Sequence, residues 1–139
     1  MTLTEKIKKI KLMAFDVDGV LTDGCLYISE SGEETKVFNT LDGHGLRMLQ
    51  DAGIIVAFIS GRKSNAVVAR ARDLGIVHVY QSVGKKPAVL QTLCTQLGLS
   101  PQDCGFMGDD VIDVGVMRLC GFAAAVAGAH KTALNAADY

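Results

Sequence analysis

The chain has 139 residues, of which 49% are hydrophobic and 21% are charged, and this length and composition fit one domain with a single core. Lys and Arg total 14 against 15 Asp and Glu, so the net charge of -1 favours neither nucleic acid nor a membrane surface as a partner. No apolar run approaches the ~18 residues of a membrane span. We expect a soluble, cytoplasmic, single-domain protein over residues 1–139.

Short apolar runs that end in polar residues alternate with helical segments along the chain. The strands are predicted over residues 11–15, 54–59, 77–80, 105–107 and 121–126. The helices between and after them are predicted over residues 46–52, 65–74, 86–97 and 111–120. This alternation predicts an α/β fold, a Rossmann-like open parallel sheet with helices on both faces.

Residues 24–38 interrupt the alternation. Two short segments, 25–28 and 35–38, flank a turn at Ser31-Gly32, and this pattern predicts a β-hairpin. Because the hairpin follows the first strand, it should project over the carboxyl edge of the sheet, where open α/β folds bind ligands. A solvent-exposed loop is the alternative interpretation.

Two carboxylates, Asp16 and Asp18, stand two residues apart at the end of the first strand, and Gly19 follows them. Like charges in a partly dry site repel each other and each carries a desolvation cost, so the pair suggests a bound cation or a shared proton. Mg²⁺ is the natural candidate because it prefers oxygen ligands and commonly shares them with phosphate.

A second acidic cluster, Asp109, Asp110 and Asp113, follows the strand at 105–107. Neighbouring parallel strands would bring this cluster beside the first one. An Asp after a strand is also a favoured helix N-cap, and Asp110 could serve that purpose. The two clusters together indicate a metal site more strongly than either does alone.

At these positions the sequence resembles the haloacid dehalogenase superfamily of phosphohydrolases. Residues 16–22 match its first motif, Asp-x-Asp-Gly-x-[Leu/Val]-Thr, and Ser60 matches the second, a Ser or Thr that ends the next strand. Lys86 matches the third motif, and residues 109–113 match the fourth. The motifs occur in order across nearly the whole chain.

The resemblance implies a role for each of these residues. Asp16 would attack phosphorus and carry the phosphoryl group, while Asp18 would protonate the leaving oxygen and later activate water. The carboxylates of Asp16 and Asp109 and the backbone carbonyl of Asp18 would bind Mg²⁺. Ser60 and Lys86 would hold the phosphoryl oxygens.

The roles of Asp110 and Asp113 stay open at this point. Either could orient metal-bound water or hold Lys86, and one of them could instead cap a helix. Lys86 is preferred over its neighbour Lys85 because it leads into the helix at the offset of the family, with Pro87 at an early helical position.

Most members of this superfamily carry a separate cap domain, and this chain has no room for one. Only the hairpin follows the first motif, and one helix and one strand fill residues 60–86. The resemblance therefore points to the capless type, in which a neighbouring subunit commonly covers the site and the assembly is a homotetramer.

Within that type, residues 16–24, 38–39, 42–45 and 60–63 resemble the phosphatases of 3-deoxy-D-manno-octulosonate 8-phosphate (Kdo-8-phosphate). This implies Mg²⁺-dependent removal of phosphate from a sugar acid in lipopolysaccharide biosynthesis. Ser60, Gly61, Arg62 and Lys86 are the expected substrate-binding residues. Arg62 suits a carboxylate or phosphate, although it could instead brace the following helix.

Three other functions are alternatives. A phosphatase of nine-carbon, sialic-acid-type 9-phosphates is disfavoured because that branch commonly has an acidic residue where Arg62 stands. A signalling receiver domain should have an Asp where Ser60 stands. A weakly active oligomerisation domain stays open, because related chains continue past 137–139 into a Gly-rich C-terminal tail that is absent here.

Overall fold

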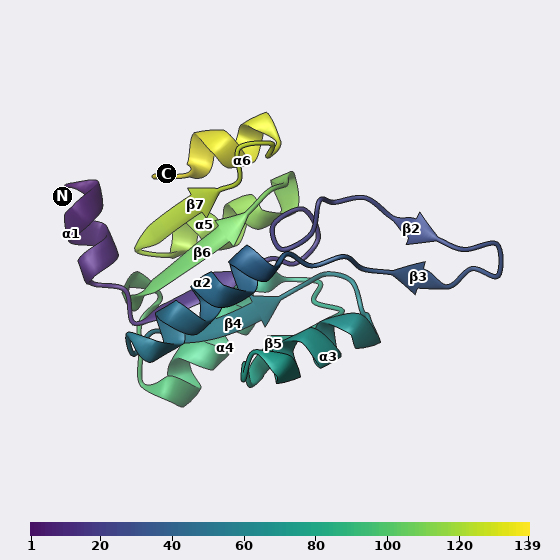
Figure 1. Ribbon diagram of the computed structural model, residues 1–139. Helices are drawn as coiled ribbons and strands as arrows, with labels where there is room; N and C mark the ends of the chain where they lie inside the picture. Colours follow the sequence, from purple (N-terminus) through teal and green to yellow (C-terminus); the bar gives the residue numbers. More distant parts are fainter.

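The computed structural model describes residues 1–139 and contains a five-stranded parallel sheet in the order β5-β4-β1-β6-β7 (Figure 1). Its strands are β1 Leu12–Phe15, β4 Ile55–Ile59, β5 His78–Tyr80, β6 Cys104–Gly108 and β7 Phe122–Ala125. The predicted α/β fold with an open parallel sheet is therefore confirmed. The central strand β1 pairs with β4 on one side and β6 on the other, so the two acidic clusters follow neighbouring strands.

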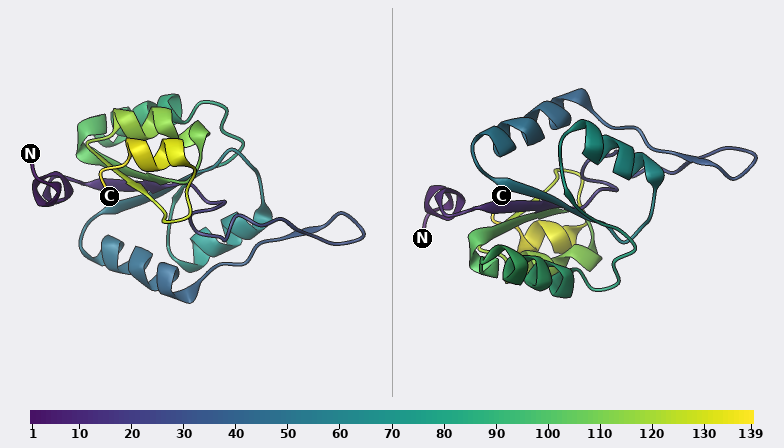
Figure 2. Two further views of the ribbon diagram at one scale, coloured as in Figure 1. Left: turned by 90° about the horizontal axis from the view of Figure 1, so that it is seen from above. Right: turned by 90° about the horizontal axis from the view of Figure 1, so that it is seen from below.

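Helices cover both faces of the sheet, as Figure 2 shows from above and below. One face carries α2 Thr40–Asp51 and α3 Asn65–Asp73, and the other carries α4 Lys86–Leu97, α5 Val114–Leu119 and α6 Lys131–Ala136. Because side chains alternate along a strand, Met13 and Phe15 belong to one core cluster and Leu12 and Ala14 to the other. Each face of β1 is therefore buried, which explains its continuous apolar sequence.

The helix ends have local causes in the sequence. Asn39 begins α2 by accepting the backbone N–H of Leu41 at 2.8 Å, and Ser64 begins α3 by accepting that of Ala66 at 3.2 Å. Gly98 ends α4 in the left-handed conformation at φ 68°, which favours glycine. The caps at Asn39 and Ser64 fix where two loops at the carboxyl edge of the sheet end, and Gly98 begins a loop at the opposite edge.

The hairpin consists of β2 Tyr27–Ile28 and β3 Glu34–Thr35, paired antiparallel around the turn at Gly32. It extends well beyond the sheet, at the end of the molecule opposite the N-terminus (Figures 1 and 2). The predicted hairpin insert after the first strand is confirmed, and no cap domain accompanies it. Its far end is exposed, while its base lies beside the loop that follows β1.

Two helices were not predicted, and a third is longer than expected. The unpredicted helices α1 Leu3–Lys8 and α6 have six residues each, too few to show a clear apolar period. Helix α2 begins at Thr40 rather than near residue 46, because the Asn39 cap outweighs two glycines in its first turns. The predicted helix 111–120 is a 3₁₀ turn, Val111–Asp113, followed by α5. None of the helices is long and apolar enough to cross a membrane.

Candidate active site

Three neighbouring strands end side by side and carry the polar residues of the site. Phe15 pairs with Phe58 of β4 and with Met107 of β6, so these strands end almost level. Asp16 continues the pairing, because its backbone N–H donates to the carbonyl of Met107 at 3.0 Å. Ser60 follows β4 directly. The sheet therefore brings together residues that are far apart in the sequence.

Lys86, the first residue of α4, lies beneath this edge of the sheet. Its ammonium donates to Asp16 Oδ1 at 2.9 Å and to Asp113 Oδ1 at 2.7 Å, and its side chain is only 3% exposed. The ring of Phe106, with its centroid 5.7 Å from Nζ, lies against it. Burial by itself lowers the pKa of Lys86, but the two carboxylates outweigh burial and raise it. The ammonium is therefore charged and shared between the two acidic clusters.

Asp113 is fully buried and uses both oxygens within the protein. Oδ1 accepts from Lys86, while Oδ2 accepts the backbone N–H groups of Asp109 at 3.0 Å and Asp110 at 3.2 Å. Asp110 is exposed, and its side chain accepts the N–H of Val111, which caps the 3₁₀ turn. Asp113 thus holds the loop that presents Asp109 and also orients Lys86.

Carboxylate oxygens of Asp16, Asp109 and Asp113 lie within 4.8 Å of one another, close enough to surround a cation. Burial and the neighbouring carboxylates raise the pKa of Asp109 to about 7. Burial also raises the pKa of Asp16, although Lys86 opposes the shift. One lysine is therefore too little positive charge for two buried carboxylates and one half-buried carboxylate, and a hard divalent cation such as Mg²⁺ fits this oxygen donor set. Because both oxygens of Asp113 already accept hydrogen bonds within the protein, Asp16 and Asp109 are the better candidate ligands.

Asp109 lies directly against the loop that follows β1. Gly19 has φ +87°, and a Cβ at this position would overlap Asp109 Oδ2. The hydroxyl of Thr22 accepts the N–H groups of Gly19 and Gly24, each at 3.2 Å, and holds the loop in its tight turn. Glycine at position 19 therefore permits the close approach of the two acidic loops.

The acidic residues open into a cleft of about 290 Å³ at the carboxyl edge of the sheet. Its lining consists of Asp16, Asp18, Gly24, Leu26, Ser60, Gly61, Arg62, Asp109, Asp110 and Ile112. All of the predicted site residues line this cleft except Lys86 and Asp113, which lie buried behind it. A volume of this size suits a small molecule rather than a macromolecule.

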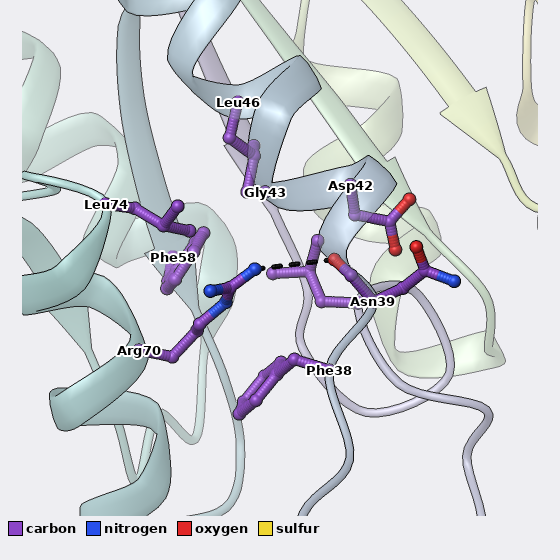
Figure 3. Close-up of a pocket in the computed structure, with 9 residues that line it drawn as sticks. Phe38, Asn39, Asp42, Gly43, Leu46, Phe58, Arg70 and Leu74 are labelled. Atoms are coloured by element: carbon purple, nitrogen blue, oxygen red, sulfur yellow. Dashed lines mark hydrogen bonds between the residues drawn. The ribbon is translucent and has the colours of Figure 1, made fainter.

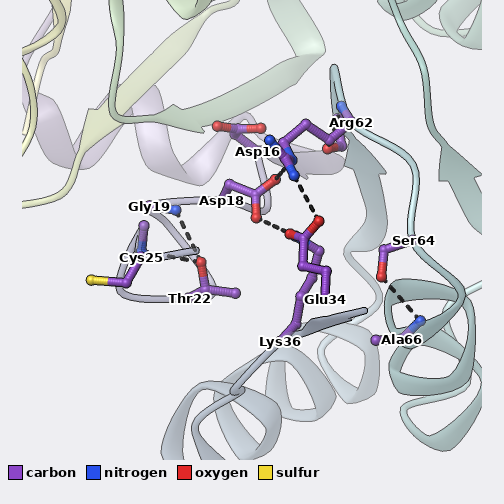
Figure 4. A network of polar contacts seen from close by, with 12 residues as sticks. Asp16, Asp18, Gly19, Thr22, Cys25, Glu34, Lys36, Arg62, Ser64 and Ala66 are labelled. Carbon is purple, nitrogen blue, oxygen red and sulfur yellow. Dashed lines mark hydrogen bonds and ion pairs between the residues drawn. The ribbon is translucent and has the colours of Figure 1, made fainter. Parts of the chain in front are cut away.

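Asp18 lies at the mouth of the cleft in a network that the sequence did not reveal (Figure 4). Lys36, just beyond β3, donates to Asp18 Oδ1 at 2.5 Å and to Glu34 Oε1 at 3.2 Å. Glu34 also accepts from Arg62 Nη2 at 2.7 Å. Lys36 and Glu34 carried no motif signal, because their contact with Asp18 depends on how the hairpin folds back over the sheet.

A second cavity, between α2 and α3, is not a candidate site. Phe38, Phe58 and Leu74 lie around it, and Arg70 crosses it to donate to the carbonyl of Asn39 at 3.4 Å (Figure 3). Its volume of about 10 Å³ is no more than one water molecule occupies. The larger acidic cleft is therefore the place where chemistry can occur.

Comparison with known proteins agrees with this geometry. A family model described as haloacid dehalogenase-like hydrolase matches residues 25–121, which is more than half of the chain. The chain belongs to the haloacid dehalogenase-like hydrolases. Among the members of this family, it is 43% identical to the 3-deoxy-D-manno-octulosonate 8-phosphate phosphatase KdsC of Salmonella typhi over 134 residues, which cover 96% of this chain and 71% of that protein.

Solved structures of other hydrolases of this family superpose closely on the fold. The 3-deoxy-D-manno-octulosonate 8-phosphate phosphatase of Moraxella catarrhalis, in complex with a magnesium ion, a phosphate ion and KDO, gives a TM-score of 0.94 at 41% identity. This match covers 97% of this chain and 78% of that one. The corresponding enzyme of Yersinia pestis also gives 0.94 at 41% identity, and the match covers 97% and 73% of the two chains.

Gly19→Ala tests whether Asp109 holds the metal in this hydrolase. The added Cβ would push the Asp109 carboxylate away, and we expect Mg²⁺ affinity to fall roughly 10- to 100-fold, measured by isothermal titration calorimetry. Gly32→Ala is the matched control, because Gly32 has the same φ of +87° with open space around it. Equal affinity in the two variants would remove Asp109 from the ligand set.

Lys86→Met tests whether the ammonium holds the acidic edge together. The change leaves two buried carboxylates without their cation, and we expect a loss of about 3–5 kcal/mol in the free energy of unfolding, measured by urea denaturation without divalent cations. The control is Lys85→Met at the exposed neighbouring position. If both variants unfold at the same urea concentration, the buried ion pairs contribute nothing to stability.

Proposed function

We propose that this chain is a Mg²⁺-dependent phosphatase that removes phosphate from Kdo-8-phosphate through an aspartyl-phosphate, as part of lipopolysaccharide biosynthesis. The observation that carries the proposal is the meeting of Asp16, Lys86 and Asp109 at one sheet edge in a chain 43% identical to KdsC. The alternative function, a weakly active oligomerisation domain, is disfavoured because such a domain does not need an intact acidic cleft.

The proposed reaction proceeds in two steps. A carboxylate oxygen of Asp16 attacks phosphorus, the bond to the sugar oxygen breaks, and that oxygen takes a proton from Asp18. Water then attacks the phosphorus of the aspartyl-phosphate and passes a proton to Asp18, the bond from the Asp16 oxygen to phosphorus breaks, and inorganic phosphate leaves. When bound by Asp16, Asp109 and the backbone carbonyl of Asp18, Mg²⁺ neutralises charge on the transferring group.

The phosphoryl oxygens have donors on two sides. A lysine ammonium has three N–H donors, and Lys86 gives two of them to Asp16 and Asp113. We propose that the third reaches the phosphoryl group. After the end of β4, the buried Ser60 and the exposed Gly61 line the cleft and are proposed to donate to the same group. Asp113 supports this arrangement from behind the cleft, and Asp110, which lines the cleft, supports it by capping the 3₁₀ turn.

Arg62 is proposed to select the sugar acid. It lines the cleft, its side chain is half-exposed, and its Nη2 lies 2.7 Å from Glu34 Oε2. A guanidinium at this position suits the carboxylate of a sugar acid. A nine-carbon, sialic-acid-type 9-phosphate is the second candidate substrate, since it offers the same two anionic groups.

We also infer the domain organisation and the cellular location of the protein. We treat residues 1–139 as one catalytic domain that contains all four motifs of the family. The proposed substrate is a small cytoplasmic metabolite, and we infer that the protein acts in the cytoplasm, with no nucleic acid or membrane partner.

Phosphate release from the purified chain tests the function. We expect Kdo-8-phosphate to be hydrolysed with Mg²⁺ and not with EDTA, and Asp16→Asn to lower kcat by at least roughly 1,000-fold because the nucleophile is lost. Asp23→Asn, at an exposed position outside the cleft, is the control. Activity that survives in Asp16→Asn would contradict the assignment of Asp16 as the nucleophile. Faster turnover of a nine-carbon sugar-acid 9-phosphate would make that compound, rather than Kdo-8-phosphate, the assigned substrate.

We also propose that a homotetramer covers the site. The hairpin exposes apolar side chains at Leu26 and Ile28, and Ile112 is 66% exposed beside the cleft. Exposed apolar groups around one opening favour burial by a neighbouring subunit. Light scattering after gel filtration should give four times the 14.7 kDa chain mass, and Ile28→Glu should lower it. A monomeric wild-type chain would contradict this part of the proposal.

A further inference from the structure

Lys36 has a side chain that is almost entirely covered, and the proposed mechanism assigns no role to its ammonium group. Its side chain is 4% exposed, although it belongs to a hairpin that is otherwise largely open to solvent. Burying an ammonium is costly unless anions surround it. Its two partners are Asp18 Oδ1 at 2.5 Å and Glu34 Oε1 at 3.2 Å. The base of the hairpin is therefore tied by charge to the loop that carries Asp18.

Glu34 fixes the position of Lys36 from the other side. Its second oxygen, Oε2, accepts from Arg62 Nη2 at 2.7 Å, so one carboxylate joins a hairpin lysine to an arginine of the loop after β4. Figure 4 shows the four side chains of Asp18, Lys36, Glu34 and Arg62 gathered at the mouth of the cleft. Because Lys36 has two anionic partners on different segments, its ammonium has little freedom to move away from Asp18.

The two oxygens of Asp18 have different surroundings. Oδ1 is held by Lys36, whereas Oδ2 has no hydrogen-bond partner in the protein. Arg62 Nε lies 3.9 Å from Oδ2, which is beyond hydrogen-bond distance. Asp18 lines the cleft. One oxygen is thus fixed to the hairpin, and the other is left for a proton or a substrate.

We propose that Lys36 is a positioning residue that holds Asp18 by Oδ1, so that Oδ2 gives its proton to the leaving sugar oxygen and later takes one from the attacking water. This inference rests on the proposed function, because it assigns Asp18 the acid and base roles. The proton moves from Oδ2 to the sugar oxygen as the bond from that oxygen to phosphorus breaks. Lys36 itself gains and loses nothing. The competing explanation is that Lys36 only anchors the hairpin.

The two explanations differ in how the effect depends on the leaving group. An alkyl oxygen leaves poorly unless it is protonated, whereas p-nitrophenolate leaves without a proton. The ratio kcat/KM reports the steps up to departure of the leaving group, so it isolates the acid step. If Lys36 positions the acid, Lys36→Met should therefore impair alkyl phosphates selectively, including those without the carboxylate that Arg62 is proposed to bind. If Lys36 only anchors the hairpin, alkyl phosphates without a carboxylate should lose no more than p-nitrophenyl phosphate.

The experiment compares Kdo-8-phosphate with p-nitrophenyl phosphate in the full chain with Mg²⁺. For Lys36→Met we expect kcat/KM to fall roughly 10- to 100-fold on Kdo-8-phosphate, part of the full general-acid effect, and less than about 3-fold on p-nitrophenyl phosphate. A burst of p-nitrophenolate should appear in the variant, because hydrolysis of the aspartyl-phosphate also needs Asp18. Glu34→Gln, which leaves Lys36 with Asp18 alone, should give a smaller loss with the same selectivity.

The matched control is Lys6→Met. Lys6 forms an ion pair with Asp138 at the same 2.5 Å, away from the cleft, and its loss should leave both substrates unaffected. Equal losses on both substrates in Lys36→Met and Glu34→Gln, or no loss on either, would overturn the positioning role.

Failure of the proposed function gives a different result. If the wild-type chain hydrolyses p-nitrophenyl phosphate but not Kdo-8-phosphate, the proposed substrate is wrong. The comparison would then use the alkyl phosphate that the wild type hydrolyses best. A wild-type chain that hydrolyses no phosphate ester would overturn both proposals together.

Discussion

The buried ammonium of Lys86 is the interaction on which the site depends. A parallel sheet places the residues after neighbouring strands at one edge, and here that brings Asp16 and Asp113 within reach of one cation. Without a cation these carboxylates would repel each other and pay for their desolvation. The first residue of α4 supplies it, so the sheet, the helix and both acidic loops meet at a single atom. The raised pKa values of Asp16 and Asp109 show that this one charge is not sufficient.

Close packing of backbone explains how the acidic loops approach each other. Gly19 leaves room for the Asp109 carboxylate, and a Cβ on Gly108 would lie 2.5 Å from that of Asp113. A side chain at Gly19 would push the two acidic loops apart, and a side chain at Gly108 would displace Asp113 within its own loop. The glycines therefore belong to the site as much as the carboxylates do, because they set the distance between charges.

The sequence predicted the parts of the fold and of the candidate site that depend on local order along the chain. Asp16, Ser60 and Asp109 each follow an apolar run directly, and parallel pairing is enough to place such residues at one edge. Helices α1 and α6 were missed because six residues show no apolar period. Lys36 and Glu34 were missed for a different reason, since their contacts require the hairpin to fold back over the loop after β1, and residue patterns do not encode that path.

Lys86 and Lys36 each hold one carboxylate by a single oxygen, that of Asp16 and that of Asp18 respectively. Lys86 donates to Oδ1 of Asp16 from below, and Lys36 donates to Oδ1 of Asp18 from the hairpin. In the proposed reaction, each carboxylate then has one oxygen fixed by an ammonium and one oxygen facing the cleft. The supports differ in rigidity, because Lys86 belongs to a buried helix and Lys36 to a projecting hairpin with only two paired residues in each strand. Under the proposed mechanism, this difference would couple the acid step at Asp18, but not the attack by Asp16, to whatever the hairpin contacts.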